Sequence, residues 1–362
     1  MQSEWGNALR VTVFGASHAP QIGVTIAGLP KGLPVDTDAL QSFLDRRAPN
    51  ARIGSTARRE PDRIVIRAGL SDGLTDGEDF VAVIENRDAD SAPYAAYADT
   101  PRPSHIDYPA RLRFGCGTDL RGGGHFSGRM TATYCIAGGI ALQALSRMGV
   151  TIAAHLLSAG DVCDAPFDPV DPDPKALSAL KEKPFPVLDD GCGARMQARI
   201  EAVKSRGDSV GGTVECIVTG FPKGHGTPLF DGVDSRLASL LFAVPAVRAV
   251  AFGSGFDAAG MTGSQHNDAY CLQNGEVRTE TNRHGGLIGG ISTGMPIVFT
   301  VAVKPTPSIA VPQKTLNLKS AEQETLQIKG RHDACIAVRA VPVIEAVAAL
   351  ALYDLLLEEQ PC

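Results

Sequence analysis

The sequence lacks closely spaced cysteines. Its eight cysteines are scattered and none belongs to a CxxC pair, which excludes a zinc ribbon and a dithiol redox motif. The start of the chain, residues 1–10, has no apolar run behind a basic patch and so lacks the pattern of a secretory signal. We expect reduced, mostly buried cysteines, no metal site and a cytoplasmic protein.

Positive charge is also scarce. The 34 basic residues are outnumbered by 40 acidic ones, which gives a net charge of −6. This balance excludes a protein that binds nucleic acid mainly by electrostatics, because such proteins need a positive surface. A local basic pocket remains compatible with it.

A convincing membrane-spanning run is missing as well. Residues 285–303 carry no charge and approach the roughly 20 residues that cross a bilayer, but they contain five glycines and Pro296. This composition is typical of a glycine-rich loop that leads into a buried strand. We therefore expect no membrane partner.

Two common phosphate-binding signatures are absent. No GKS or GKT follows a glycine-rich loop, and no GxGxxG motif is present. A Walker loop and a Rossmann-type nicotinamide site are therefore excluded. There is also no internal repeat, heptad pattern or low-complexity tract.

The sequence does contain many short element signals separated by glycine and proline. Alternating apolar residues predict strands, and apolar residues at helical spacing behind capping residues predict helices. Strands and helices do not alternate regularly, so we predict an α+β fold rather than a doubly wound sheet. The Pro- and Asp-rich residues 161–195 are expected to form a surface excursion. The predicted strands are 9–14, 23–26, 64–66, 81–83, 214–218 and 298–303, and the predicted helices are 37–47, 127–148, 233–241 and 340–357.

Two loops combine backbone freedom with groups that can carry a proton. Ser17 and His18 follow a predicted strand in the segment Gly-Ala-Ser-His, and a strand end is a usual place for functional groups. Arg102, His105 and Asp107 place a cation, an imidazole and a carboxylate close together. Taken alone, His18 is better explained as a loop residue with satisfied hydrogen bonds, whereas the segment of His105 fits a loop and a functional site equally well.

A third loop precedes the predicted helix over residues 127–148. Three glycines at 122–124 are followed by His125, Phe126, Ser127 and Arg129. Glycines before a helix N-terminus expose backbone N–H groups that can hold an anion. A flexible turn is the alternative explanation.

Further cationic segments lie elsewhere in the chain. Residues 304–308 (Lys-Pro-Thr-Pro-Ser) leave a predicted strand, and residues 330–333 (Gly-Arg-His-Asp) precede the last predicted helix. The plain alternative is a bent strand exit for the first segment and a charged helix cap for the second.

A basic cluster is formed by Arg46, Arg47, Arg52, Arg58 and Arg59. Its plain alternative is a solvated face.

Considered together, these segments describe one cationic site. It would hold several arginines, two or three imidazoles, a carboxylate and anion-binding loops. Such a site suits a multiply anionic small substrate and a phosphorylated cofactor, because the planar guanidinium binds carboxylate and phosphate through paired hydrogen bonds.

The whole set of motifs resembles the chorismate synthase family. The resemblance implies a 1,4-anti elimination of phosphate from 5-enolpyruvylshikimate 3-phosphate to give chorismate, with reduced FMN required although there is no net redox change. It implies a single domain over residues 1–362, built as a β-α-β sandwich with a helical layer between antiparallel sheets, and a homotetramer. The motifs, in order from residue 15 to 356, are GxSH, RRxP, ARREPD, RPSHIDY, DLRGGGHFSGR, GDSVGG, GSQHND, GGLIGGISTGMP, KPTPSI and GRHDACIAVRAVPVIEA.

The resemblance also implies roles for individual residues. His18 would protonate the departing phosphate, His105 would protonate the reduced flavin, and Asp333 would assist proton removal at flavin N5. Imidazoles suit such roles because they titrate near neutral pH. The implied substrate-binding residues are Ser17, Arg47, Arg52, Arg102, Arg129 and Arg331. The implied flavin-binding residues are His125, Phe126, Ser127, Pro245, Ala246, Gly289, Lys304, Pro305, Thr306, Pro307, Ser308 and Arg331.

Two segments depart from the usual family pattern. Residues 15–19 read GASHA where GESHG is usual, and residues 122–131 read GGGHFSGRMT where GGGRSSARET is usual. One alternative is therefore a homologue that binds flavin and anions but is catalytically impaired. Another is a structural or regulatory oligomer that uses its basic loops for contacts. NADPH would enter only as a source of reducing equivalents, and the sequence does not decide between self-reduction and an external reductant.

Overall fold

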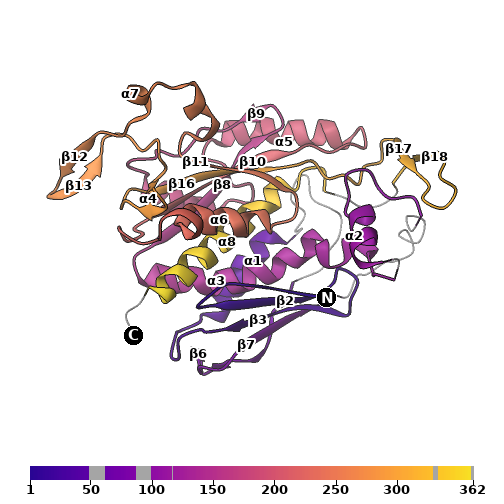
Figure 1. Cartoon of the computed structure of the whole chain (residues 1–362), viewed down its shortest axis with the longest axis horizontal. Coiled ribbons are helices and arrows are strands. Elements are labelled where there is room, and N and C mark those ends of the chain that lie inside the picture. Colours follow the sequence, from indigo (N-terminus) through magenta and orange to yellow (C-terminus); the bar gives the residue numbers. More distant parts are fainter. Residues whose placement is uncertain (49–61, 87–98, 116, 329–332, 360–362) are drawn as a thin grey trace.

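Two antiparallel five-stranded sheets enclose a layer of helices (Figure 1). This arrangement is seen in a computed structural model, which describes residues 1–48, 62–86, 99–115, 117–328 and 333–359. The predicted α+β fold, with helices between antiparallel sheets, is confirmed.

The first sheet is built mostly from the N-terminal part of the chain. Its strands alternate between buried residues that face the helices and more exposed ones, as the period-2 pattern predicts. The strand order is β1-β2-β3-β7-β4, all pairs antiparallel. The bounds are β1 Gln2–Trp5, β2 Arg10–Gly15, β3 Gln21–Ala27, β7 Phe80–Glu85 and β4 Val65–Ala68.

The second sheet is buried on both faces. On β10, Cys216 belongs to the main core, whereas Ile217 belongs to a smaller cluster on the outer face. The strand order is β11-β16-β10-β8-β9, all antiparallel. The bounds are β11 Val247–Phe252, β16 Ile297–Val303, β10 Gly212–Thr219, β8 Thr151–Ala159 and β9 Val162–Cys163.

Residues 161–195 add the edge strand β9 to the second sheet and then cover part of its outer face. They contain β9, helix α4 (Pro174–Glu182) and the start of helix α5 (Asp190–Lys204). Phe167 and the α4 residues Leu177 and Leu180 pack with Ile217 in the smaller cluster. The segment is thus a covering layer with its own apolar contacts (Figure 1).

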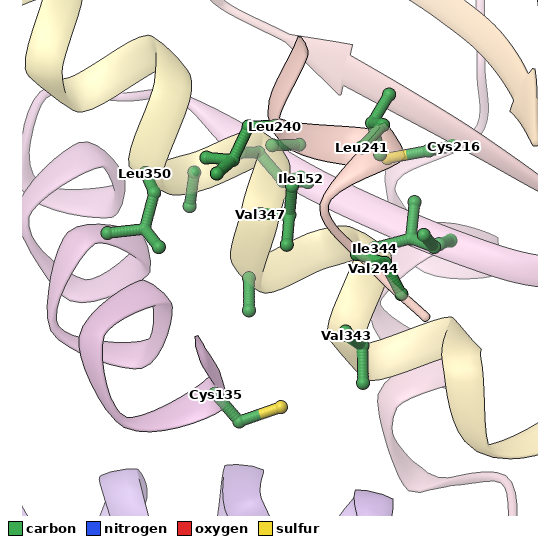
Figure 2. Packing of buried hydrophobic residues seen from close by; sticks show 14 of the residues in the cluster. Cys135, Ile152, Cys216, Leu240, Leu241, Val244, Val343, Ile344, Val347 and Leu350 are labelled. Carbon is green, nitrogen blue, oxygen red and sulfur yellow. The ribbon is translucent and has the colours of Figure 1, made fainter. Parts of the chain in front are cut away.

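Four helices make up the layer between the sheets, namely α1 (Thr37–Arg47), α3 (Thr131–Arg147), α6 (Val233–Phe242) and α8 (Ala337–Glu358). Figure 2 shows Leu240 and Leu241 of α6 with Ile344 and Val347 of α8 in the core. Helices α3 and α8 approach so closely that a Cβ on Gly138 would lie 2.3 Å from the carbonyl oxygen of Ala346. Glycine is therefore required at this crossing.

Helix α8 is the core of the layer. It is long and apolar enough to cross a membrane, but 94% of its most apolar window is buried inside the protein. Its two buried acids have partners, as buried charges must. Glu345 binds Arg46 and the backbone N–H of Ala154, and Asp354 accepts from the N–H of Leu9 at 2.7 Å.

Helix boundaries follow the sequence with one notable difference. Asp36 caps α1 by accepting from the N–H groups of residues 38 and 39, as expected. In contrast, α3 begins at Thr131 rather than at Ser127. The preceding segments, Arg121–Phe126 and Gly128–Met130, are short 3-10 segments, and the positive φ of the three glycines at 122–124 interrupts the helical geometry of the first.

The remaining elements are short and peripheral. Residues 285–303 form a small hairpin followed by β16, which confirms a glycine-rich loop leading into a buried strand. The other elements are helices α2 (Asp107–Phe114) and α7 (Gly263–His266), and hairpins β5–β6 (Leu70–Ser71, Leu74–Thr75), β12–β13 (Tyr270–Gln273, Glu276–Thr279), β14–β15 (Leu287–Ile288, Ile291–Ser292) and β17–β18 (Gln313–Leu316, Gln323–Leu326).

Candidate active site

The two candidate acid–base histidines lie against one glycine turn. A Cβ on Gly122 would lie 2.6 Å from Nε2 of His18, and a Cβ on Gly123 would lie 3.8 Å from Nε2 of His105. Both glycines have positive φ, at +58° and +89°. The turn therefore needs glycine both for its backbone conformation and for the space that the imidazoles occupy.

The loop that carries His18 is fastened to this glycine turn. The N–H of Ser17 donates to the carbonyl of Gly124 at 3.0 Å. His125 Nδ1 lies 2.8 Å from the carbonyl of Gly15 and can only donate to it, and Nε2 lies 3.0 Å from the hydroxyl of Ser3. The His125 ring thus joins β1, β2 and the turn.

His105 is oriented by a carboxylate that is itself clamped. Its Nδ1 lies 2.7 Å from Oδ1 of Asp107. Arg102 binds both oxygens of Asp107, each at 2.8 Å, and adds its own backbone N–H at 3.1 Å. The carboxylate fixes Nδ1 as the protonated nitrogen, so Nε2 is the nitrogen presented toward Gly123.

Burial lowers the pKa of His105 below its ordinary value, and the charges of Arg102 and Lys304 act in the same direction. The hydrogen bond and charge of Asp107 oppose this shift. The pKa of Asp107 is itself held far below its usual range by Arg102 and His105, despite burial. His105 is therefore neutral at pH 7 and Asp107 is ionised.

Two arginines share a single buried acid. Arg47 and Arg129 each bind a different oxygen of Asp62, Arg47 at 2.9 Å. Arg129 also donates from Nε to the side-chain oxygen of Asn86 at 3.0 Å, and Asn86 donates to the carbonyl of Ala19 at 2.7 Å. The arginines are thereby tied to the loop that carries His18.

Positive charge exceeds negative charge in this cluster. Burial and the charges of Arg339 and Arg129 lower the pKa of Arg47 to about 10, with Asp62 opposing the shift. Nη2 of Arg129 is buried and has no hydrogen-bond partner among the described residues. A buried unpaired guanidinium nitrogen is costly, and an anionic ligand is a natural partner for it.

Asp333 enters the same network from the segment just before α8. Arg339 binds Oδ2 of Asp333 at 2.7 Å and donates from Nε to the carbonyl of Arg47 at 3.0 Å. The carbonyl of Asp333 accepts from the hydroxyl of Thr306 at 2.9 Å. Asp333 is therefore connected both to the arginine cluster and to residues 304–308.

Residues 304–308 lie beside the segment that carries His105. Nζ of Lys304 donates to the carbonyl of Ser104 at 2.7 Å, and Arg102 donates to the hydroxyl of Ser308 at 3.3 Å. The N–H of Lys304 donates to the carbonyl of Ala246 at 2.9 Å. Ser104 and Ala246 both have positive φ, at +56° and +74°, and such strain in non-glycine residues is concentrated at functional sites.

Some expected site residues are not drawn into this cluster. Gly289 lies next to Gly290, which packs at the start of α6, whereas Ala246 follows the end of that helix. Phe126 packs against Phe114, with ring centroids 5.9 Å apart. Arg52 and Arg331 lie outside the described residues.

The solvated-face explanation is wrong for the part of the basic cluster that can be seen. Arg47 is buried, and the side chain of Arg46 is only 15% exposed and pairs with Glu345 at 2.6 Å. Arg58 and Arg59 lie outside the described part of the chain.

Three supporting residues were missed by the sequence analysis. Asp62 and Arg339 stand within two of the quoted motifs, ARREPD and GRHDACIAVRAVPVIEA, which could have drawn attention to them. Asn86 stands in none, and only its contacts with Arg129 and with the loop of His18 identify it.

Comparison with known proteins agrees with this geometry. The family model for chorismate synthase matches residues 9–357. Curated chorismate synthases from Lancefieldella parvula and Thermococcus gammatolerans are each 43% identical, covering 98% of this chain and 96% and 98% of theirs. A chorismate synthase crystal structure superposes with a TM-score of 0.77 at 25% identity, over 98% of this chain and 93% of that one. The chain belongs to the chorismate synthase family, whose members are carbon–oxygen lyases of the shikimate pathway.

Proposed function

We propose that the chain is an active chorismate synthase, which eliminates phosphate in the 1,4-anti sense from 5-enolpyruvylshikimate 3-phosphate with reduced FMN bound at the candidate site. One observation carries the assignment of the site. His18, His105, Arg129 and Asp333 are far apart in the sequence but lie in one network of contacts around the glycine turn and Asp62.

The arginine cluster suits the anionic groups of the substrate. Arg47 and Arg129 bring two guanidinium groups to one carboxylate, and Nη2 of Arg129 is left for a ligand. Arg102 binds both oxygens of Asp107. It therefore serves the site in two ways, by its positive charge and by holding the carboxylate that orients His105. Ser17, Arg52 and Arg331 complete the proposed substrate contacts.

The two imidazoles suit proton transfer at different atoms. His18 lies with Ser17 against Gly122, on the loop that Asn86 ties to Arg129, so a phosphate held by the arginines would be within its reach as a leaving group. His105 presents Nε2 on the side of Gly123, with Asp107 behind it to stabilise a positive charge. Asp333 would accept a proton near the flavin N5.

The residues around Lys304 fit a flavin. This segment connects the surroundings of His105 with Asp333. Lys304 bonds to Ser104 and Ser308 bonds to Arg102, both in the segment that carries His105. Thr306 bonds to Asp333. Bound in reduced form, FMN would supply an electron transiently and take up the hydrogen from ring carbon 6. The other proposed contacts are His125, Phe126, Ser127, Pro245, Ala246, Pro305, Pro307 and Arg331.

Assembly as a homotetramer is part of the proposal. Helix α6 separates Gly289 from Ala246 by its ten residues, about 15 Å at 1.5 Å per residue. In this proposal, the flavin contact by Gly289 comes from a second copy of the chain. Tyr270, Leu272 and Val277 are 72%, 74% and 61% exposed on the projecting hairpin β12–β13 (Figure 1), which supports an interface there.

The test is anaerobic turnover of the enolpyruvyl substrate with photoreduced FMN. We expect phosphate release and chorismate absorbance to rise together, and neither to appear with oxidised flavin. A folded protein that binds reduced FMN without turnover would show that catalysis is impaired. We also propose a cytoplasmic location, with NADPH entering only as a source of electrons. Turnover of the enolpyruvyl substrate under air, with NADPH and FMN as the only further additions, would show that the protein reduces its own flavin.

A further inference from the structure

Arg339 occupies a position that helix stability does not explain. It is the third residue of α8, whose first turn contains no acidic residue. The helix dipole disfavours a cation at this end, where backbone N–H groups already carry partial positive charge. The side chain is only 19% exposed, so water does little to relieve the repulsion. Another interaction must hold the arginine there.

Two contacts account for its placement, and both lead into the candidate site. Nη1 of Arg339 binds Oδ2 of Asp333 at 2.7 Å. Nε donates to the carbonyl of Arg47 at 3.0 Å, at the last residue of α1. One guanidinium therefore fixes a proposed proton acceptor and the backbone of a proposed substrate-binding residue in the same geometry.

Arg339 also adds charge to a cluster that is already positive. It contributes the largest single charge effect on Arg47, lowering the pKa of that guanidinium, and Arg129 acts in the same direction. Within the cluster, the three guanidiniums of Arg47, Arg129 and Arg339 face two carboxylates, Asp62 and Asp333. The like-charge repulsion is relieved when an anion binds between the arginines.

We propose that Arg339 is a positioning residue for the elimination. It orients the carboxylate of Asp333 and supplies the excess positive charge that strengthens anion binding by Arg47 and Arg129. This inference rests on the proposed roles of Asp333 and Arg47. A purely structural role, as a cap for the end of α1, would require only the hydrogen bond to the carbonyl of Arg47.

Two variants separate these roles. Arg339→Lys keeps the charge but loses the planar fork that reaches both partners. Arg339→Gln keeps a donor for the carbonyl of Arg47 but removes the charge. We expect Arg339→Lys to lower kcat about 10- to 100-fold with little change in KM. Residues that orient a functional group through a hydrogen bond, as the outer partners of metal ligands do, have effects of this size. We expect Arg339→Gln to raise KM as well.

The matched control is Arg199 of α5, which binds Asp161 through Nε at 2.6 Å in a pair whose side chains are 36% and 75% exposed. Arg199→Lys and Arg199→Gln should leave kcat and KM unchanged, because exposed ion pairs contribute little. Melting temperatures of all four variants establish that each is folded.

A double-mutant cycle with Asp333→Asn gives the decisive outcome. If Arg339 acts through Asp333, Arg339→Lys should change kcat little further once Asp333→Asn is present. Additive losses, or a fall in melting temperature with kcat unchanged, would overturn the inference. Wild-type enzyme without turnover would instead contradict the proposed function. In that case, the inference about Arg339 can still be tested by measuring the affinity for the enolpyruvyl substrate by thermal shift. The same affinity in wild type and in Arg339→Gln would overturn the inference.

Discussion

Arg102 binds Asp107 with a two-pronged guanidinium, Nε to Oδ2 and Nη2 to Oδ1, both at 2.8 Å. The pair is almost fully buried, and Oδ1 of Asp107 also accepts a hydrogen bond from Nδ1 of His105 at 2.7 Å. The arginine thus keeps the carboxylate ionised, and the carboxylate fixes the imidazole. Removal of any member should change the behaviour of His105.

We expect His105→Ala to lose about 10²- to 10⁴-fold in kcat, the usual contribution of a general acid–base group. Asp107→Asn should give a smaller loss, because the amide oxygen can still accept from Nδ1 but the charge is gone. Stopped-flow measurement of chorismate formation would check both. Asp99→Asn is the control, because Asp99 pairs with Arg111 at the surface at 3.3 Å. Near-wild-type kcat in His105→Ala would contradict the role of His105.

The glycine turn offers a sharp test of the place of His18. In Gly122→Ala, the new methyl group would lie 2.6 Å from His18 Nε2 and 2.8 Å from Ser17 Oγ, at a φ of +58°. The strain costs about 1–3 kcal/mol, and displacement of a catalytic group by 1 Å can cost about 10²-fold in rate. We expect a large fall in kcat and a lower melting temperature. Gly128→Ala in the same segment is the control, because its Cβ would meet nothing within 4 Å.

Local signals in the sequence were enough for most of the fold. The α1 bounds were predicted because a capping acid, Asp36, and helical spacing act within a few residues. The start of α3 was misplaced, since an apolar pattern does not show that Gly122–Gly124 adopt positive φ. The pairing of Arg46 with Glu345 was not predictable, because it joins residues 299 positions apart.

The site was predictable only as a set of motifs. The resemblance named His18, His105 and Asp333, but it did not show how they are connected. The links run through Asp62, Asn86 and Arg339, whose partners depend on how three layers pack together. Side-chain hydrogen bonds across such distances have no signature in composition or periodicity.

Arg129 provides a test of anion binding that does not need turnover. Its Nη2 is buried and lacks a partner among the described residues. The enolpyruvyl substrate should raise the melting temperature, by an amount that corresponds to about 2.7 kcal/mol at a concentration of 100 Kd. Arg129→Gln should abolish most of this shift, and Arg199→Gln should keep it. An equal shift in wild type and Arg129→Gln would show that the anion binds elsewhere.

The hairpin β12–β13 should control assembly. Tyr270, Leu272 and Val277 lie on one of its faces, and Leu272 is opposite Val277 in the register. An isolated two-stranded hairpin is marginally stable in water, so burial of this face in a second copy would stabilise it. Leu272→Asp should shift the protein from the proposed tetramer to smaller species in multi-angle light scattering. Leu316→Asp on hairpin β17–β18, a residue that is 43% exposed, is the control and should remain tetrameric.

The last prediction concerns a buried ionic group outside the site. His155 is fully buried on β8 between Asp164, 3.1 Å from Nδ1, and Glu215, 2.9 Å from Nε2. Hydrogen bonds to these carboxylates raise its pKa above the ordinary value of 6.5, although burial acts in the opposite direction. The pKa of Asp164 is held below 3.8 by His155 and by backbone N–H groups, again against burial. Glu215 also accepts from the N–H of Phe167, so the group anchors residues 161–195 to the sheet.

A histidine with a raised pKa stabilises the fold fully below its unfolded pKa and loses that contribution as pH rises through the folded value. An acid with a lowered pKa stabilises above its unfolded pKa and loses its contribution as pH falls through the folded value. The contribution of the group is therefore greatest between about pH 4 and 6.5, given those ordinary pKa values. We expect the free energy of unfolding, measured in urea, to fall between pH 6 and pH 9.

His155→Gln should lose about 3–5 kcal/mol at pH 6, because it leaves buried acids without their charged partner. It should also flatten the fall above pH 6. Lys204→Gln is the control, since it breaks an exposed pair with Glu201 at 3.4 Å and should change neither the stability nor its pH dependence. A variant at His155 that keeps the wild-type slope would show that other groups set the pH dependence of this fold.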